Sequence, residues 1–155
     1  MAGTFKLSNG IAATIRKGKR SDSDQIASLI FEWLRWKKER SPTIRDSIRA
    51  GEVVVAELKT GDKSLIGFVH GSVHNDPIHG DKRIFLTAFY VKPEYRGLGL
   101  GSALLKTLID AAVLKHQILG VETSTMTRDA VKFYKKFGFV QDKEEIGEVF
   151  LNLKL

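Results

Sequence analysis

A glycine-rich segment, Arg96-Gly97-Leu98-Gly99-Leu100-Gly101-Ser102, constrains the fold of this chain more than any other feature. Residues 83–91 before it are rich in β-branched and aromatic side chains, and in residues 101–115 after it the apolar side chains recur at helical spacing. Glycines lack the Cβ atoms that hold a ligand away from the backbone, so successive amides can converge where the helix starts. The segment predicts a strand–loop–helix unit with an anion site suited to a pyrophosphate, although glycines also form tight turns that bind nothing.

Two common nucleotide-binding loops do not fit this segment. The pattern G-x-G-x-x-G needs a third glycine at position 102 or 104, and the chain has Ser102 and Leu104 there. A phosphate loop of the Walker type ends in Gly-Lys-Ser or Gly-Lys-Thr, and the chain contains neither sequence. The loop therefore belongs to neither of these nucleotide-binding classes.

Hydrophobic periodicity and turn residues predict one mixed sheet. Three strands suited to antiparallel pairing precede a strand–helix–strand crossover of the length that a parallel pair needs. We expect an α/β (α+β) fold with a mostly antiparallel sheet of six to seven strands and helices on both faces, forming a single domain over residues 1–155 with 1–10 loosely ordered. The predicted strands are 11–16, 52–58, 64–73, 83–91, 121–126, 140–141 and 149–153, and the predicted helices run from the N-cap residues 21–24 to about 38 and over 43–50, 101–115 and 128–136.

Composition limits the available chemistry. The chain has no cysteine, which excludes disulfides, thiolate metal sites and a cysteine nucleophile. Its net charge of +7 favours an anionic partner, such as a nucleotide cofactor or nucleic acid, but it is equally typical of a solvated surface that binds nothing. The spacing of His70, His74 and His79 is irregular, so we expect no metal site. Without a signal-like start or a long apolar run, we expect a soluble, cytoplasmic protein that does not bind membranes.

Two motifs resemble one known family. The first is Val91-Lys92-Pro93-Glu94-Tyr95 followed by Arg-x-x-Gly-x-Gly at the start of a helix, and the second is the segment 130–139 with its tyrosine, Tyr134, and its Gly138-Phe139 end. Together with the element order, they are similar to the GNAT superfamily of acyl-CoA-dependent N-acetyltransferases. The resemblance implies acetyl-CoA as cosubstrate and a V-shaped split between the fourth and fifth predicted strands. It implies these cofactor contacts: Phe89, Tyr90, Val91, Arg96, Gly97, Leu98, Gly99, Leu100, Gly101, Ser102 and Thr127.

The resemblance also implies a mechanism. Tyr134 falls on the general-acid tyrosine that protonates the departing thiolate, whereas on its own it reads as an ordinary aromatic residue of an amphipathic helix. Many relatives carry a glutamate base six residues before the position of Pro93, where this chain has Thr87. Thr87 is expected to order a water, and Glu122, Glu32 and His70 are candidate bases. Each of the three is equally consistent with a structural role, Glu122 on a polar strand face, Glu32 on a charged helix surface and His70 within a strand.

The residues that would bind the acceptor amine carry the weakest sequence signal. Glu144 and Glu145 lie in a segment that borders the acceptor site of this family and would attract a cationic amine, although exposed turns also carry such charges. Thr127 stands where relatives often have an asparagine. Without cysteine, we expect direct transfer to an amine in a ternary complex. The acceptor can be a small amine, a protein N-terminus or a lysine side chain, and the protein a monomer or homodimer.

Two other functions stay open at this point. The missing strand glutamate is consistent with a non-catalytic acyl-CoA sensor. A basic nucleic-acid-binding protein is a more distant alternative, because no known DNA or RNA reader motif accompanies the charge. The basic side chains around the first two predicted helices form a basic patch that consists of Lys37, Lys38, Arg40, Arg45 and Arg49. This basic patch would also suit docking of an acidic acceptor protein.

Overall fold

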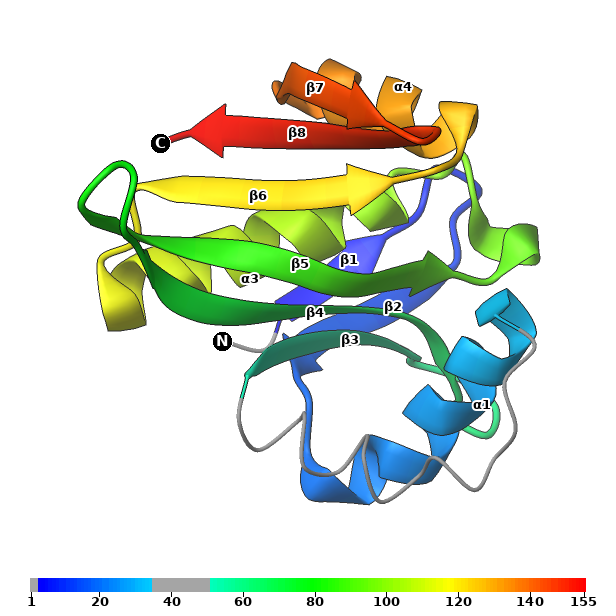
Figure 1. Cartoon of the computed structure of the whole chain (residues 1–155). Helices are drawn as coiled ribbons and strands as arrows, with labels where there is room; N and C mark the ends of the chain where they lie inside the picture. Colours follow the sequence, from blue (N-terminus) through cyan, green and yellow to red (C-terminus); the bar gives the residue numbers. More distant parts are fainter. Residues whose placement is uncertain (1–2, 35–50) are drawn as a thin grey trace.

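The computed structural model describes residues 3–34 and 51–155, which form one eight-stranded sheet with helices on both faces (Figure 1). The strand order is β1-β2-β3-β4-β5-β6-β8-β7, and every neighbouring pair is antiparallel except β5 and β6. The expected mixed, mostly antiparallel α+β fold is thereby confirmed. The strands are β1 (Gly3–Lys6), β2 (Ala12–Lys17), β3 (Glu52–Leu58), β4 (Leu65–Asp76), β5 (Asp81–Val91), β6 (Gly120–Thr125), β7 (Val140–Glu145) and β8 (Glu148–Lys154).

The helices bury a different apolar cluster on each face of the sheet. Helix α1 (Ser23–Leu34) covers β3 to β5 with Ile26, Leu29 and Ile30, which pack on Phe68 and its neighbours. Helices α3 (Leu100–His116) and α4 (Arg128–Phe137) lie on the opposite face (Figure 1). The leucines at helical spacing in α3 are fully buried there, as the periodicity predicts. No helix within residues 3–34 and 51–155 has the length and apolar character needed to cross a bilayer.

The structure differs from the prediction at both edges of the sheet. Gly3–Lys6, expected to be loosely ordered, forms the edge strand β1, and the last hairpin begins with Val140–Glu145 where a strand of two residues was expected. All six residues of β7 are exposed, so no alternation of apolar and polar residues marks it. The sheet therefore has eight strands instead of six or seven. The predicted helix 43–50, the end of the first helix near residue 38 and the basic patch lie outside the described residues.

The sheet opens between β5 and β6. Their parallel pairing is confined to Arg83–Phe85 with Gly120–Glu122, although β5 continues to Val91 and β6 to Thr125. The two strands lie side by side where these residues pair, and they separate toward their carboxyl ends (Figure 1). This confirms the split expected between the fourth and fifth predicted strands. Ligands of open sheets bind where strand carboxyl ends meet helix starts, which here is the opening beside the glycine-rich loop.

Candidate functional site

The glycine-rich loop makes the turn that the sequence predicts. Gly97 and Gly99 have φ angles of 72° and 89°, in the left-handed region that glycine adopts without strain. Gly99 is the N-cap of α3, Leu100 is buried as its first residue, and among the described residues no side chain caps this helix start. A Cβ on Gly97 would project into open space. The uncapped amides and the open backbone fit an anionic group such as a pyrophosphate.

Arg96 is held against the end of β5. Its Nε donates a hydrogen bond to the carbonyl of Val91 at 2.8 Å, and its guanidinium lies 5.2 Å from the ring centroid of Tyr90. Ser102 is exposed in the first turn of α3. A positive side chain and a hydroxyl therefore flank the helix start, as expected from the sequence.

The backbone of β5 alternates between β4 and the opening. The amide of Lys92 donates to the carbonyl of Ile66 on β4 at 2.9 Å, and Tyr90 pairs with Phe68 in the same register. In an antiparallel pair, alternate residues turn their backbone groups toward the same neighbour. Phe89 and Val91 therefore turn theirs toward the opening, whereas Tyr90 turns its own toward β4. Of the three residues of β5 predicted to contact a ligand, Phe89 and Val91 have their backbone groups on the open side of the strand, and Tyr90 does not.

An aromatic cluster surrounds Tyr134 behind the opening. Its ring centroid lies 5.1 Å from that of Phe139, 5.4 Å from Phe133 and 6.4 Å from Phe89 of β5. Gly101 of α3 lies against α4, since a Cβ there would be in van der Waals contact with the ring of Phe133 at 3.4 Å. The side chain of Tyr134, 6% exposed, thus joins α4 to the edge of the opening.

The hydroxyl of Tyr134 shares a hydrogen bond with Thr123 on β6. Thr123 directly follows Glu122, the last residue of β6 that pairs with β5, so this hydroxyl lies where the strands diverge. Burial raises the pKa of Tyr134, and the hydrogen bond from Thr123 lowers it by less, so the pKa stays above its ordinary value. Tyr134 is therefore protonated at neutral pH, as a proton donor must be.

Thr87 occupies a β-bulge of β5 that lies beside the opening. His70 pairs with Ala88 and Gly71 with Leu86, so Thr87 is the extra residue of β5. The bulge keeps Phe89 and Val91 on the same face as Ile84 and Leu86, in the cluster with Tyr134, while Ala88 and Tyr90 face α1. The Thr87 hydroxyl contacts Nδ1 of His70. Two residues that were considered separately as water-ordering group and base are therefore one contact pair.

The two carboxylates considered as bases each lie close to basic side chains. Glu122 has His74 at 3.5 Å and Arg83 at 4.0 Å, although its buried Oε1 accepts no hydrogen bond from the described residues. Glu32 lies 3.5 Å from the ammonium group of Lys92 and accepts a hydrogen bond of 3.3 Å from the hydroxyl of Tyr90. Glu32 thus links α1 to the end of β5 through these two contacts.

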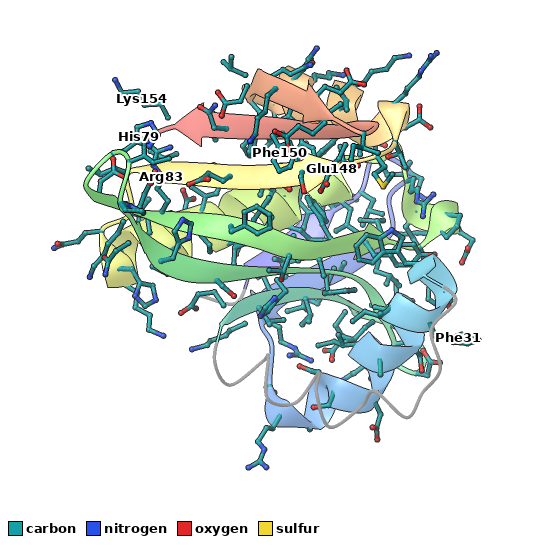
Figure 2. The ribbon with its side chains drawn as sticks, in the orientation of Figure 1. Phe31, His79, Arg83, Glu148, Phe150 and Lys154 are labelled. Carbon is teal, nitrogen blue, oxygen red and sulfur yellow. The ribbon has the colours of Figure 1, made fainter. Side chains whose placement is uncertain are left out.

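One carboxylate beside the opening was not singled out from the sequence. Glu148 of β8 accepts a 2.6 Å hydrogen bond from Ser124 of β6, beside the opening, and Figure 2 shows it next to Phe150. The alternation of β8, with Val149, Leu151 and Leu153 packed on the other face, is the signal that places Glu148 there.

The remaining predicted site residues form an ion pair on the surface and a helix cap. Glu144 and Glu145 are exposed on β7, and Glu145 forms an ion pair with Lys143 at 3.2 Å. Thr127 is the N-cap of α4, where its hydroxyl accepts a hydrogen bond from the amide of Ala130 at 3.4 Å. Within the described part of the chain, no group of three or more histidine or acidic side chains is placed to hold a metal ion.

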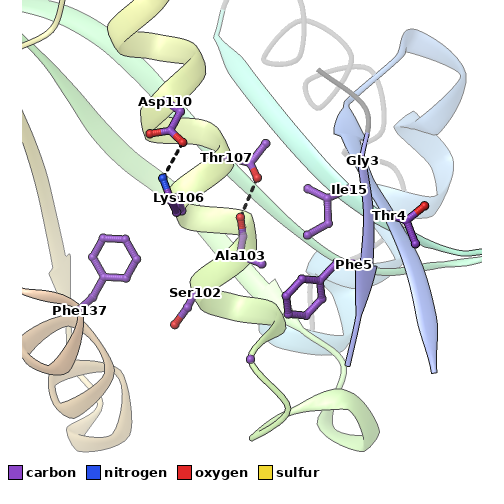
Figure 3. Close-up of a pocket in the computed structure, with 11 residues that line it drawn as sticks. Gly3, Thr4, Phe5, Ile15, Ser102, Ala103, Lys106, Thr107, Asp110 and Phe137 are labelled. Carbon is purple, nitrogen blue, oxygen red and sulfur yellow. Dashed lines mark hydrogen bonds and ion pairs between the residues drawn. The ribbon is translucent and has the colours of Figure 1, made fainter. Parts of the chain in front are cut away.

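A groove of about 630 Å³ adjoins the glycine-rich loop on the outer side of α3 (Figure 3). Phe5 of β1 forms one wall, Ser102 and Lys106 lie on the helix between, and Phe137 of α4 stands on the far side. Lys106 pairs with Asp110 at 2.8 Å. The groove shares Gly99 and Ser102 with the loop, but Tyr134 and Thr87 do not line it.

These features agree with a known family. Residues 22–139 match the model of the acetyltransferase (GNAT) family, and the chain belongs to that family. Among curated proteins, it is 25% identical over 121 residues to an uncharacterized N-acetyltransferase, ycf52, of Pyropia yezoensis. The match covers 74% of this chain but only 63% of that relative, so the chain spans less than two thirds of the relative's length.

Solved structures of the same fold support the assignment. The GNAT domain of S. lividans PAT has a TM-score of 0.74 at 18% identity, covering 99% of this chain and 97% of that one. A GNAT superfamily phosphinothricin acetyltransferase from Sinorhizobium meliloti, solved in complex with AcCoA, has a TM-score of 0.73 at 17% identity, covering 92% of this chain and 88% of that one. At these identities the likeness concerns the fold.

Proposed function

We propose that this protein is an N-acetyltransferase that moves the acetyl group of acetyl-CoA to an amine by direct attack in a ternary complex. The observation that carries the proposal is the buried, protonated hydroxyl of Tyr134 beside Thr123, at the point where β5 and β6 diverge. Membership of the acetyltransferase (GNAT) family supports it, and so does the glycine-rich loop at the start of α3.

The loop and the open edge of β5 would hold acetyl-CoA. The uncapped amides at the start of α3 suit the pyrophosphate, with Arg96 and Ser102 as additional donors. The backbone groups of Phe89 and Val91 suit the amide groups of pantetheine, which would add to the sheet like an extra strand. A ligand amide that binds the Val91 carbonyl would share it with Arg96 or displace the Arg96 hydrogen bond.

The chemistry then needs three proton and charge movements. An alkylammonium has a pKa of about 10.4 and no free lone pair, so it must lose a proton before it attacks the thioester carbonyl. The tetrahedral intermediate carries an oxyanion, for which a backbone amide of Phe89 or Val91 is the donor on this side of β5. Tyr134 protonates the sulfur as the carbon–sulfur bond breaks.

A thiol-release assay tests the proposal directly. Because the chain has no cysteine, a thiol reagent detects only the CoA that turnover releases. The acceptors are spermidine, free lysine and a peptide with a free N-terminus, and calorimetry measures acetyl-CoA binding separately. Release that requires an amine supports the transferase, whereas binding without release by any of the three supports the sensor. Absence of acetyl-CoA binding contradicts both.

A further inference from the structure

Thr87 and His70 come together from strands that the sequence keeps apart. They are separated by 17 positions, and the bulge in β5 brings the Thr87 hydroxyl against Nδ1 of His70 on β4. The same hydroxyl lies 3.4 Å from the backbone carbonyl of His70, so both groups of the histidine fix its position. Thr87 is exposed, whereas His70 is half-buried below it.

The imidazole of His70 is closely packed against the backbone of Gly51. Gly51 passes directly over the imidazole, because a Cβ on Gly51 would collide with Nε2 and would be 2.8 Å from the carbonyl of Gly71. Glycine is therefore required at position 51 by the approach of the ring. Nδ1 points toward Thr87 while Nε2 points toward Gly51, so the ring orientation is defined by both neighbours.

Position along the sheet places this pair at the reaction. Phe85 is the last residue of β5 that pairs with β6, and Thr87 follows within the opening. Tyr134 approaches the opening from the face of α3 and α4, while His70 follows Phe68 on the face that α1 covers. Among the described residues near this face, His74 and Arg83 lie beside Glu122, Arg83 also pairs with Asp81, and Tyr90 donates a hydrogen bond to Glu32 of α1.

We propose that Thr87 and His70 together take up the proton that the acceptor amine must lose; this inference rests on the proposed acetyl transfer. The ammonium gives one proton to Thr87 Oγ1, whose own proton passes to Nδ1 of His70. The neutral amine forms the carbon–nitrogen bond, the carbon–sulfur bond breaks, and the sulfur takes the proton of Tyr134. The second proton of the attacking nitrogen restores Tyr134, and His70 releases its proton to solvent. The products are the N-acetyl amine, CoA and one proton.

Substitutions of both residues test the relay. The probes are acetyl-CoA and whichever of spermidine, lysine or the free peptide N-terminus gives the highest wild-type rate. Thr87→Val keeps the shape of the side chain and removes the hydroxyl, while Thr87→Ser keeps the hydroxyl. We expect kcat to fall about 100-fold in Thr87→Val and in His70→Gln, and by less than about threefold in Thr87→Ser. The double variant should be no slower than either single variant, because the two groups act as one unit.

Two further measurements separate proton transfer from a structural role. If His70 accepts the proton, kcat of wild type at saturating amine should fall at low pH, and His70→Gln should lose this acidic limb. Added imidazole should restore part of the rate of His70→Ala. His79→Gln is the matched control, because His79 also bonds through Nδ1, but to Asp76 in the β4–β5 hairpin. It should keep the wild-type rate and pH profile.

Several results overturn the proposal. A His70→Gln protein with wild-type kcat, an unchanged acidic limb, or Thr87→Ser as slow as Thr87→Val would each do so. Imidazole NMR gives a readout without turnover, since Thr87→Val should shift the Nδ1 resonance of His70, and an unshifted resonance contradicts the contact. If wild type binds acetyl-CoA but acetylates none of the three amines, the proposed function fails and the relay fails with it.

Discussion

Replacing Tyr134 with phenylalanine removes a single hydroxyl from the centre of the proposed site. The side chain is 6% exposed and the hydroxyl is bonded to Thr123, which is 3% exposed. Leaving the Thr123 hydroxyl buried without this partner costs about 1–3 kcal/mol of stability. A domain with an unfolding free energy of about 5–15 kcal/mol remains folded after such a loss.

The catalytic effect should be larger than the effect on stability. General acid catalysis contributes about 10²- to 10⁴-fold, which corresponds to about 2.7–5.5 kcal/mol of the activation barrier. We therefore expect kcat of Tyr134→Phe to fall at least about 100-fold, while the dissociation constant of acetyl-CoA stays within about threefold of wild type. The thiol-release assay measures kcat, and calorimetry measures binding.

Thr123→Val is the matched control for this substitution. It breaks the same hydrogen bond and should lower the melting temperature to a similar extent, but it keeps the phenol. Because the bond from Thr123 lowers the pKa of Tyr134, its loss should move any alkaline limb of the rate profile to higher pH. If Tyr134→Phe and Thr123→Val have the same kcat, the hydroxyl of Tyr134 is not the proton donor and the reasoning is refuted.

Two further predictions concern the loop and the sheet. Gly97 and Gly61 both have a φ of 72° and open space around the Cβ position, so alanine at either should cost about 1–2 kcal/mol of stability. Only Gly97→Ala should weaken acetyl-CoA binding in calorimetry, and equal affinities would contradict the loop assignment. Burial alone would raise the pKa of Asp22, but hydrogen bonds from Arg16 and the Lys19 amide outweigh it and lower the pKa. Its stabilisation is therefore present above pH 3.8 and lost as the pH falls through the lowered value; Asp22→Asn should destabilise the protein at pH 7 by about 1–3 kcal/mol and flatten the acid side of its melting-temperature profile.

The sequence predicts those elements whose side chains face a core. Strand β3 is expected and found at 52–58, because its continuous run of β-branched and apolar residues is buried on both faces of the sheet. Helix α3 differs from the prediction by one residue at each end, because its apolar residues recur at helical spacing. Strand β1 escapes prediction, and only the first two residues of β7 are predicted, since both strands are exposed edges held by backbone hydrogen bonds to β2 and β8. Backbone pairing alone produces no pattern of apolar and polar side chains from which a strand could be predicted.

The site is predictable where it is local and unpredictable where it depends on register. Loop residues 96–102 are adjacent in sequence, so their conformation follows from their own glycines. Contact between Thr87 and His70 depends on which residue of β5 opposes which residue of β4, and the count is shifted by the bulge. Glu148 and Ser124 likewise meet only through the pairing of β6 with β8. Neither contact leaves a spacing that a single sequence reveals.

The bulge gives one residue of β5 two consequences for the proposed chemistry. If Thr87 occupied a regular strand position instead of a bulge, strict alternation after Ile84 and Leu86 would turn Ala88 and Tyr90 toward α3 and α4, and Phe89 toward α1. Phe89 would then leave the aromatic cluster that holds Tyr134. The bulge keeps Phe89 in that cluster and at the same position directs the Thr87 hydroxyl to His70. The proposed proton donor and the proposed proton acceptor therefore depend on the same distortion of β5, from opposite faces of the opening.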